Sequence, residues 1–233
     1  MSSEAHDFGI KFIVDIVPNH TSSEHKWFKE ALAAKPGSKE RDRYMFRDGK
    51  GPNGELPPNN WEAVFGGPAW ERVIEADGKP GQWYLHLFAV EQPDLNWENQ
   101  EVKDHLEDVL KFWLDRGVDG FRIDVAHGMI KEAGLPDIKK DPAAEMLGTD
   151  HKPFWDQEGV HDIYRSWRKI FDSYPCNQIR HNHDHVVVMD TKEKSRSHQY
   201  QVTSSMEAVN EYLLHRRCHR HLNQQMSVDK SGR

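Results

Sequence analysis

Residues 9–15 read GIKFIVD and residues 117–124 read GVDGFRID, and these two stretches decide the fold. Each begins with a glycine of the kind that ends a helix, continues as a short strand and finishes on an aspartate. Residues 2–8 are typical of the end of a helix, and the apolar residues 12–14 are expected to form a buried strand. Helix, glycine, short strand and acid, occurring twice, predict a parallel α/β fold.

Two longer segments carry the apolar spacing of amphipathic helices. Between residues 101 and 116 apolar side chains recur every three or four positions, which places them along one helical face. Gly117 ends this helix before the second strand, and the same spacing predicts another helix over residues 160–174. The two stripes contain Val102, Leu106, Val109, Leu110, Trp113 and Leu114 in the first helix, and Ile163, Trp167, Ile170 and Phe171 in the second.

A long insertion separates the two strands. Asp15 and Asp124 are 109 residues apart, whereas one strand–helix–strand step needs only ~30 residues. The inserted residues are rich in Pro, Gly and Trp, and their alternating run at 83–88 predicts a strand. Because ligands bind at loops that follow the carboxyl ends of parallel strands, the insertion is expected to form one wall of a site.

The composition divides the chain into four regions. Residues 1–20 and 99–175 are the two α/β segments, residues 21–98 are the insertion, and residues 176–233 are an atypical tail. All 8 Trp and all 10 Phe lie at or before Phe171, whereas 7 of the 15 His lie in the tail. With so little to build a core from, the tail is expected to be poorly ordered apart from a strand at 186–189 and a helical turn or two at 206–214. The abrupt change at Pro175 suggests a truncated or frame-altered product, or a fragment of a longer chain.

The overall composition excludes several classes of protein. A formal net charge of -7 argues against nucleic acid or an anionic membrane as a partner. No apolar run approaches the ~20 residues of a membrane span, and two cysteines cannot form a disulfide framework. We therefore expect a soluble, cytoplasmic protein.

Three short motifs bring polar groups to the strand ends. Residues 15–20, DIVPNH, place an acid, an amide and an imidazole over the end of the first strand. Arg122 and Asp124 are two positions apart on the second strand, so both project from the same face. A buried carboxylate beside an arginine keeps its charge, as the nucleophile of a glycosidase must. The third motif, residues 92–96, is QPDLN.

Each motif also has an ordinary structural interpretation. Asn and Pro favour turns, so residues 15–20 are equally consistent with a tight turn that carries a surface histidine. Arg122 and Asp124 are consistent with a structural ion pair at the rim of the sheet. Residues 92–97 are consistent with a loop that caps the following helix.

Taken together, the three motifs resemble the α-amylase superfamily of glycoside hydrolases, in particular its α-glucosidase and oligo-1,6-glucosidase branch. DIVPNH and GFRIDVAH resemble the first two signatures of that family, and QPDLN is a marker of the branch. The insertion matches the domain B of the family in position. The resemblance implies a partial (β/α)8 barrel with this insertion after one strand.

The resemblance also implies roles for individual residues. Asp124 is implied as the nucleophile of a retaining mechanism and Arg122 as the residue that orients it. His20, Asp15, Phe65 and His127 are implied to contact the substrate, a small oligosaccharide or other α-glucoside. Neither a cofactor nor a metal ion is implied. Val125 stands at a position linked in this branch to the choice between α-1,4 and α-1,6 bonds.

The family pattern is incomplete in this chain. A retaining glycosidase needs a second carboxyl group as acid and base, which the family supplies as a Glu expected near residue 183. Residues 181–185 read HNHDH instead, and nothing in the sequence supports Asp190 or Glu193 as a substitute. Two hypotheses therefore remain open: an α-glucosidase, and a catalytically inactive remnant or sugar-binding module that lacks this acid.

Overall fold

The computed structural model describes residues 2–139, 141–147, 151–174 and 186–190. Their helices are α1 (Ser2–Asp7), α2 (Lys26–Ala33), α3 (Lys39–Asp42), α4 (Gln100–Leu114), α5 (Pro142–Leu147) and α6 (Val160–Ser173), with a 3-10 turn at Ala126–Gly128. Their strands are β1 (Ile13–Ile16), β2 (Phe46–Arg47), β3 (Trp70–Ile74), β4 (Pro80–Leu85), β5 (Gly120–Asp124) and β6 (Val186–Asp190). None of the helices within these ranges is long and apolar enough to cross a membrane.

One of the two sheets that the structure describes is parallel, with the strand order β1–β5–β6. β1 and β5 pair from Ile13 opposite Gly120 to Ile16 opposite Ile123. β6 adds a third parallel strand, as the apolar run at 186–189 predicts. The parallel α/β prediction is therefore confirmed, although the barrel is not closed by the three strands that the structure describes.

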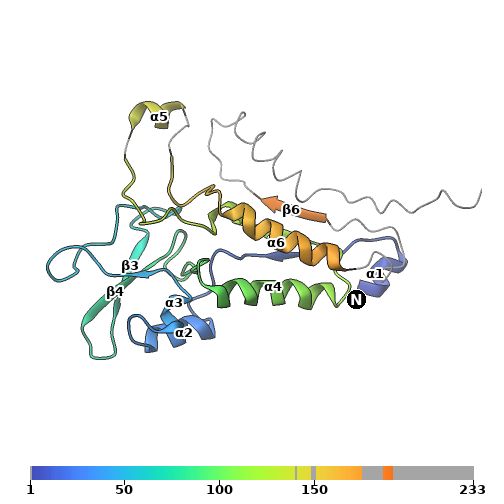
Figure 1. Ribbon diagram of the computed structural model, residues 1–233, viewed down its shortest axis with the longest axis horizontal. Coiled ribbons are helices and arrows are strands. Elements are labelled where there is room, and N and C mark those ends of the chain that lie inside the picture. The colour runs from blue at the N-terminus through green and yellow to red at the C-terminus, as the bar shows by residue number, and fades with distance from the viewer. Residues whose placement is uncertain (1, 140, 148–150, 175–185, 191–233) are drawn as a thin grey trace, which may run out of the picture.

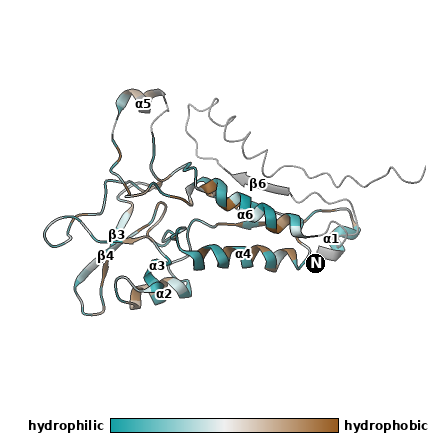
Figure 2. Ribbon diagram, viewed as in Figure 1, coloured by the Kyte–Doolittle hydropathy of each residue, from teal (hydrophilic) through white to brown (hydrophobic). Residues whose placement is uncertain are grey.

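Helices α4 and α6 lie side by side along this sheet (Figure 1). Their brown apolar positions alternate with teal polar ones, as expected for two half-buried helices (Figure 2). Asn99 caps α4 by accepting hydrogen bonds from the backbone of Glu101 and Val102, and Gly117 ends the segment at φ 81°. The rings of Phe121 on β5 and Phe171 on α6 stack 5.7 Å apart, so both predicted helical stripes reach the core.

β1 departs from its prediction. The strand begins and ends one residue later than expected, so Asp15 lies inside it and Ile16 is its buried residue. Phe12 and Ile13 are exposed, which contradicts the buried strand that their apolar character predicts. β1 is the edge of the described sheet, so no further strand covers its outer side there.

The insertion contains an antiparallel sheet in the order β2–β4–β3. β4 begins at Pro80 and ends at Leu85, so the predicted strand at 83–88 is correct only in its first half. The indoles of Trp61 and Trp70 lie in a core of their own, 6.4 Å apart, and Trp70 Nε1 donates to Asn59. Trp61 and Trp70 therefore serve a second small core, whereas Trp97 belongs to the main one.

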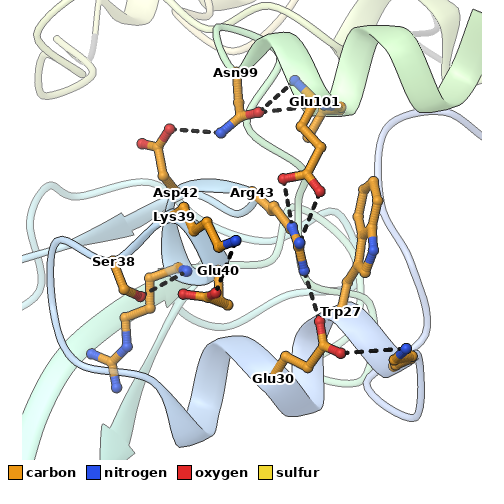
Figure 3. Close-up of polar contacts among 12 residues, drawn as sticks. Trp27, Glu30, Ser38, Lys39, Glu40, Asp42, Arg43, Asn99 and Glu101 are labelled. Carbon is orange, nitrogen blue, oxygen red and sulfur yellow. Dashed lines mark hydrogen bonds and ion pairs between the residues drawn. The ribbon is translucent and has the colours of Figure 1, made fainter.

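Arg43 attaches the insertion to α4 (Figure 3). Its guanidinium donates two hydrogen bonds to Glu101, at 2.9 and 2.8 Å, and one to Glu30 on α2 at 2.8 Å. The same group lies over the ring of Trp27, 4.7 Å from its centroid. One nearly buried arginine thereby ties α2 to the first turn of α4.

Candidate active site

One guanidinium joins the acids of the parallel sheet. Asp15 on β1 lies in register with Arg122 on β5, and Asp124 follows two positions later on the same face. Arg122 Nη2 donates to Asp124 Oδ1 over 3.1 Å, and Arg122 Nη1 forms an ion pair with Asp15. The expectation that Arg122 and Asp124 share a face is confirmed. We call these three residues the carboxylate cluster.

The carboxylate cluster is only partly buried. The side chains of Asp15, Arg122 and Asp124 are 52%, 35% and 38% exposed, so the predicted buried carboxylate is not observed. The physical reason is the open sheet, because the three described parallel strands do not close into a barrel around the cluster. Water therefore reaches Asp124.

The backbone turns sharply after Asp124. Val125 has φ 52° and ψ 33°, a left-handed conformation that is costly for a β-branched residue. Trp155 packs against this turn so closely that a Cβ on Gly128 would lie 2.4 Å from Trp155 Cζ3. The ring of His127 packs on the same indole, with 4.5 Å between ring centroids. The turn thus fixes His127 just beyond the end of β5.

Aromatic rings from the insertion continue from this turn. Phe88 lies at their centre, 6.1 Å from Trp155, 5.9 Å from Phe65 and 5.2 Å from His20, measured between ring centroids. Phe65 is 73% exposed. Aromatic side chains with a few placed polar groups are the usual lining of a small-molecule site. We call Phe65, Phe88 and Trp155 the aromatic strip; sequence reasoning named only the first of the three.

A buried ion pair connects the DIVPNH and QPDLN motifs to the loop that follows β5. Asn19 Nδ2 donates to Asp94 Oδ2 over 3.0 Å, and Lys131 Nζ lies 2.7 Å from the same oxygen. Lys131 also donates to Asn19 Oδ1 over 2.9 Å and to the carbonyl of Gly128 over 2.6 Å. We call Asn19, Asp94 and Lys131 the buried junction. Sequence reasoning missed Lys131, since a single lysine in a loop carries no spacing signal.

Burial decides the electrostatics of the junction and of His20. Desolvation lowers the pKa of Lys131, and the charge of Asp94 opposes that shift. Desolvation likewise lowers the pKa of His20, while Asp94 and, more weakly, Asp124 oppose the shift. His20 is therefore neutral at pH 7. Its Nε2 lies 3.1 Å from Nε2 of Gln92, the first residue of the QPDLN motif.

A separate cavity of about 610 Å³ lies between residues 129–135 and the insertion. Arg47, Asn96 and Glu132 contribute to its wall, as does Lys131 of the buried junction. The carboxylate cluster and His20 do not line it. This cavity therefore adjoins the junction and is distinct from the space above Asp124.

Several residues and segments considered in the sequence lie outside the described residues. These are the alternating histidines His181, His183 and His185, the acid Glu193, and the predicted helical turns at 206–214, as well as both cysteines. Within the described ranges, no group of three or more His, Cys, Asp or Glu side chains is arranged to hold a metal ion.

Comparison with known proteins places this geometry in a family. The model of the α-amylase catalytic domain matches residues 1–231. The chain belongs to the α-amylase family. It is 51% identical to the oligo-1,6-glucosidase of Parageobacillus thermoglucosidasius over 175 residues, covering 75% of this chain and 30% of that protein. It is 42% identical to the trehalose-6-phosphate hydrolase of Bacillus subtilis, covering 74% and 28% respectively.

Solved structures agree with the sequence comparison. The trehalose-6-phosphate hydrolase of Bacillus licheniformis superposes with a TM-score of 0.67 at 38% identity, covering 83% of this chain and 31% of that one. The chain therefore spans about 30% of the length of the relatives it matches. The resemblance of the three motifs to the α-amylase family is therefore confirmed. The α/β fold of this chain matches about 30% of the length of solved structures of that family.

Proposed function

We propose that the chain acts as an α-glucosidase-type glycoside hydrolase that cleaves the α-glucosidic bonds of maltose-like or isomaltose-like oligosaccharides with retention. The carboxylate cluster carries this proposal, because it holds Asp124 beside a guanidinium at the carboxyl end of a parallel strand. The names of similar oligo-1,6-glucosidases support the substrate class. So does a solved trehalulose synthase complex with sucrose, at 34% identity and a TM-score of 0.65.

The chemistry assigned to Asp124 is nucleophilic attack. Its carboxylate oxygen bonds to the anomeric carbon as the bond from that carbon to the leaving sugar breaks, and the leaving oxygen takes a proton from a second carboxyl group. Water then attacks the glucosyl–enzyme ester and releases Asp124. Arg122 orients the carboxylate and stabilises its charge throughout.

The remaining roles are proposed from the family resemblance and from the chemistry of each side chain. The neutral His20 is suited to hydrogen-bond a sugar hydroxyl, because a neutral imidazole both donates and accepts. Phe65 and the other rings of the aromatic strip supply flat apolar faces for the pyranose ring. His127, held against Trp155, contributes a polar group at the end of β5, and Asp15 supports Arg122 from the neighbouring strand.

Hydrolysis of p-nitrophenyl α-glucoside by the purified chain tests the proposal. We expect release of p-nitrophenol, and a loss of at least about 10³-fold in Asp124→Asn, the size of effect typical when an essential nucleophile is removed. Asp108→Asn, an exposed acid on α4, is the matched control and keeps full activity. Binding of isomaltose by calorimetry without any hydrolysis would instead support the sugar-binding module.

A further inference from the structure

The imidazole of His20 lies between the side-chain amides of two other residues. Asn19 Nδ2 is 3.3 Å from His20 Nδ1, and Gln92 Nε2 is 3.1 Å from His20 Nε2. Burial lowers the pKa of His20, so the ring is neutral at pH 7. A neutral imidazole carries a proton on one nitrogen and accepts a hydrogen bond at the other. The two amides therefore cannot both donate to the ring, and one of them must give way.

The buried junction fixes the orientation of the Asn19 amide. Lys131 Nζ can only donate, and it lies 2.9 Å from Asn19 Oδ1, so this atom must be the carbonyl oxygen. The amide nitrogen donates to Asp94 Oδ2 over 3.0 Å, which leaves its second hydrogen for His20 Nδ1. Reversing the amide would set its N–H groups against a buried ammonium and its oxygen against a buried carboxylate. Because Asn19 is 0% exposed, water could not relieve either contact.

The amide of Gln92 is held less firmly. Its Oε1 accepts one hydrogen bond, from the backbone N–H of Ala89 over 3.1 Å, and its side chain is only partly buried. A turn of 180° about the last bond of Gln92 gives up this one neutral hydrogen bond and presents Oε1 to His20 Nε2. The contacts that hold Asn19 involve two charged groups, and such hydrogen bonds are roughly twice as strong as neutral ones. Gln92 is therefore the amide that yields.

We propose that Asn19 is a positioning residue that fixes the proton of His20 on Nε2. Nδ1 accepts from Asn19, and Nε2–H is the donor on the side of Gln92. The charge of Asp124 opposes the fall in the pKa of His20, so the ring lies within electrostatic range of the carboxylate cluster. The catalytic consequence rests on the proposed function: His20 donates to an oxygen of the sugar and does not accept from a sugar hydroxyl.

Two-bond nitrogen–proton NMR spectra of the ¹⁵N-labelled chain at pH 7 test this inference directly, because they distinguish protonated from unprotonated imidazole nitrogens. The signals of His20 are those that disappear in His20→Asn. We expect Nδ1 to resonate as an unprotonated nitrogen and Nε2 as a protonated one. The reverse assignment, a proton shared equally between the two nitrogens, or two protonated nitrogens would each overturn the inference.

Variants separate the roles of the two amides. Gln92→Met should keep the proton on Nε2, whereas Asn19→Ala should move it to Nδ1, because Gln92 then donates to Nε2 unopposed. In Asn19→Ala we also expect kcat/KM for p-nitrophenyl α-glucoside to fall about 10–100-fold, as when a polar group in a buried site loses its partner. Asn99→Ala, which removes an asparagine that caps α4, is the matched control and should change neither the signals of His20 nor kcat/KM.

Each outcome bears on a different part of the inference. If Asn19→Ala keeps the proton on Nε2, Asn19 does not set the tautomer and the inference is wrong. If that variant does not fold, a proton on Nδ1 in the unmodified chain or in Gln92→Met overturns the inference, and a proton on Nε2 in both supports it. If the proton is on Nε2 but the unmodified chain does not hydrolyse p-nitrophenyl α-glucoside, the proposed function fails and the assignment of the proton stands.

Discussion

Two pairs of oppositely charged side chains differ in their burial. Lys131 and Asp94 lie 2.7 Å apart with side chains 2% and 0% exposed, where the insertion meets the loop after β5. Arg122 and Asp124 lie 3.1 Å apart on the open sheet, and each is more than one-third exposed. The buried pair is a structural connection that cannot lose one partner cheaply. The exposed pair contributes little to stability and is accessible to a ligand.

The largest expected effect is on the buried junction. Lys131→Met leaves the carboxylate of Asp94 buried without its cation, so we expect a loss of about 3–5 kcal/mol in the free energy of unfolding. Urea denaturation measures this change. Lys29→Met, which removes an exposed pair with Glu24, is the control and should change the value by less than about 0.5 kcal/mol. Equal losses of unfolding free energy in Lys131→Met and Lys29→Met would show that the buried pair is no more important for stability than an exposed one.

A smaller effect is expected where Arg43 attaches the insertion to α4. Arg43→Lys keeps the charge but loses the two parallel hydrogen bonds to Glu101 and the planar contact with Trp27. We expect a loss of about 1–2 kcal/mol in urea denaturation. Arg165→Lys, at an exposed ion pair with Asp162 on α6, should leave the free energy of unfolding unchanged. An unchanged free energy of unfolding in Arg43→Lys would show that a positive charge alone is enough to attach the insertion to α4.

Acid should lower the free energy of unfolding through His20, which lies next to Asn19 of the buried junction. Because burial lowers the pKa of His20 in the folded chain below 6.5, the unfolded chain binds more protons between that lowered pKa and pH 6.5. Stability therefore falls as the pH drops from 6.5 through this window, by at most about 1.4 kcal/mol for each unit. His20→Asn should flatten the curve of unfolding free energy against pH. An unchanged slope in that variant would assign the effect to other groups.

The smallest stability effect is expected at the site itself. Asp124→Asn removes one side of a pair that is more than one-third exposed, so the free energy of unfolding should change by less than about 1 kcal/mol. Thermal and urea denaturation of the same preparation used for the activity assay provide the measurement. A loss as large as that of Lys131→Met would mean that the carboxylate cluster is a structural element.

The sequence predicted the features that depend on local spacing and missed those that depend on contacts between distant segments. The helical stripe from Val102 to Leu114 follows from local periodicity and is observed where expected. The second strand was expected over residues 118–123, but it begins two residues later, at Gly120, and includes Asp124. The burial of Ile13 was overestimated because an apolar strand carries no information about whether a neighbour will cover it. Lys131 and Trp155 act through contacts between distant segments, which no local pattern records.

In the site, too, local spacing was predictable and strand register was not. Arg122 and Asp124 share a strand, so their relation was predictable from a spacing of two, and Asp15 became their partner through the pairing of β1 with β5. The pairing of Asp190 with Asp124 depends on the register of a third strand, which the apolar run at 186–189 predicts as a strand but does not align.

Covalent trapping tests the central claim about Asp124 most directly. The chain is incubated with 5-fluoro-α-glucosyl fluoride, which forms the glucosyl–enzyme ester faster than water can break it, and the digested protein is mapped by mass spectrometry. We predict a single fluoroglucosyl adduct on the peptide that contains Asp124 and no adduct in Asp124→Asn. An adduct on a different carboxylate, or undiminished hydrolysis by Asp124→Asn, would contradict the account.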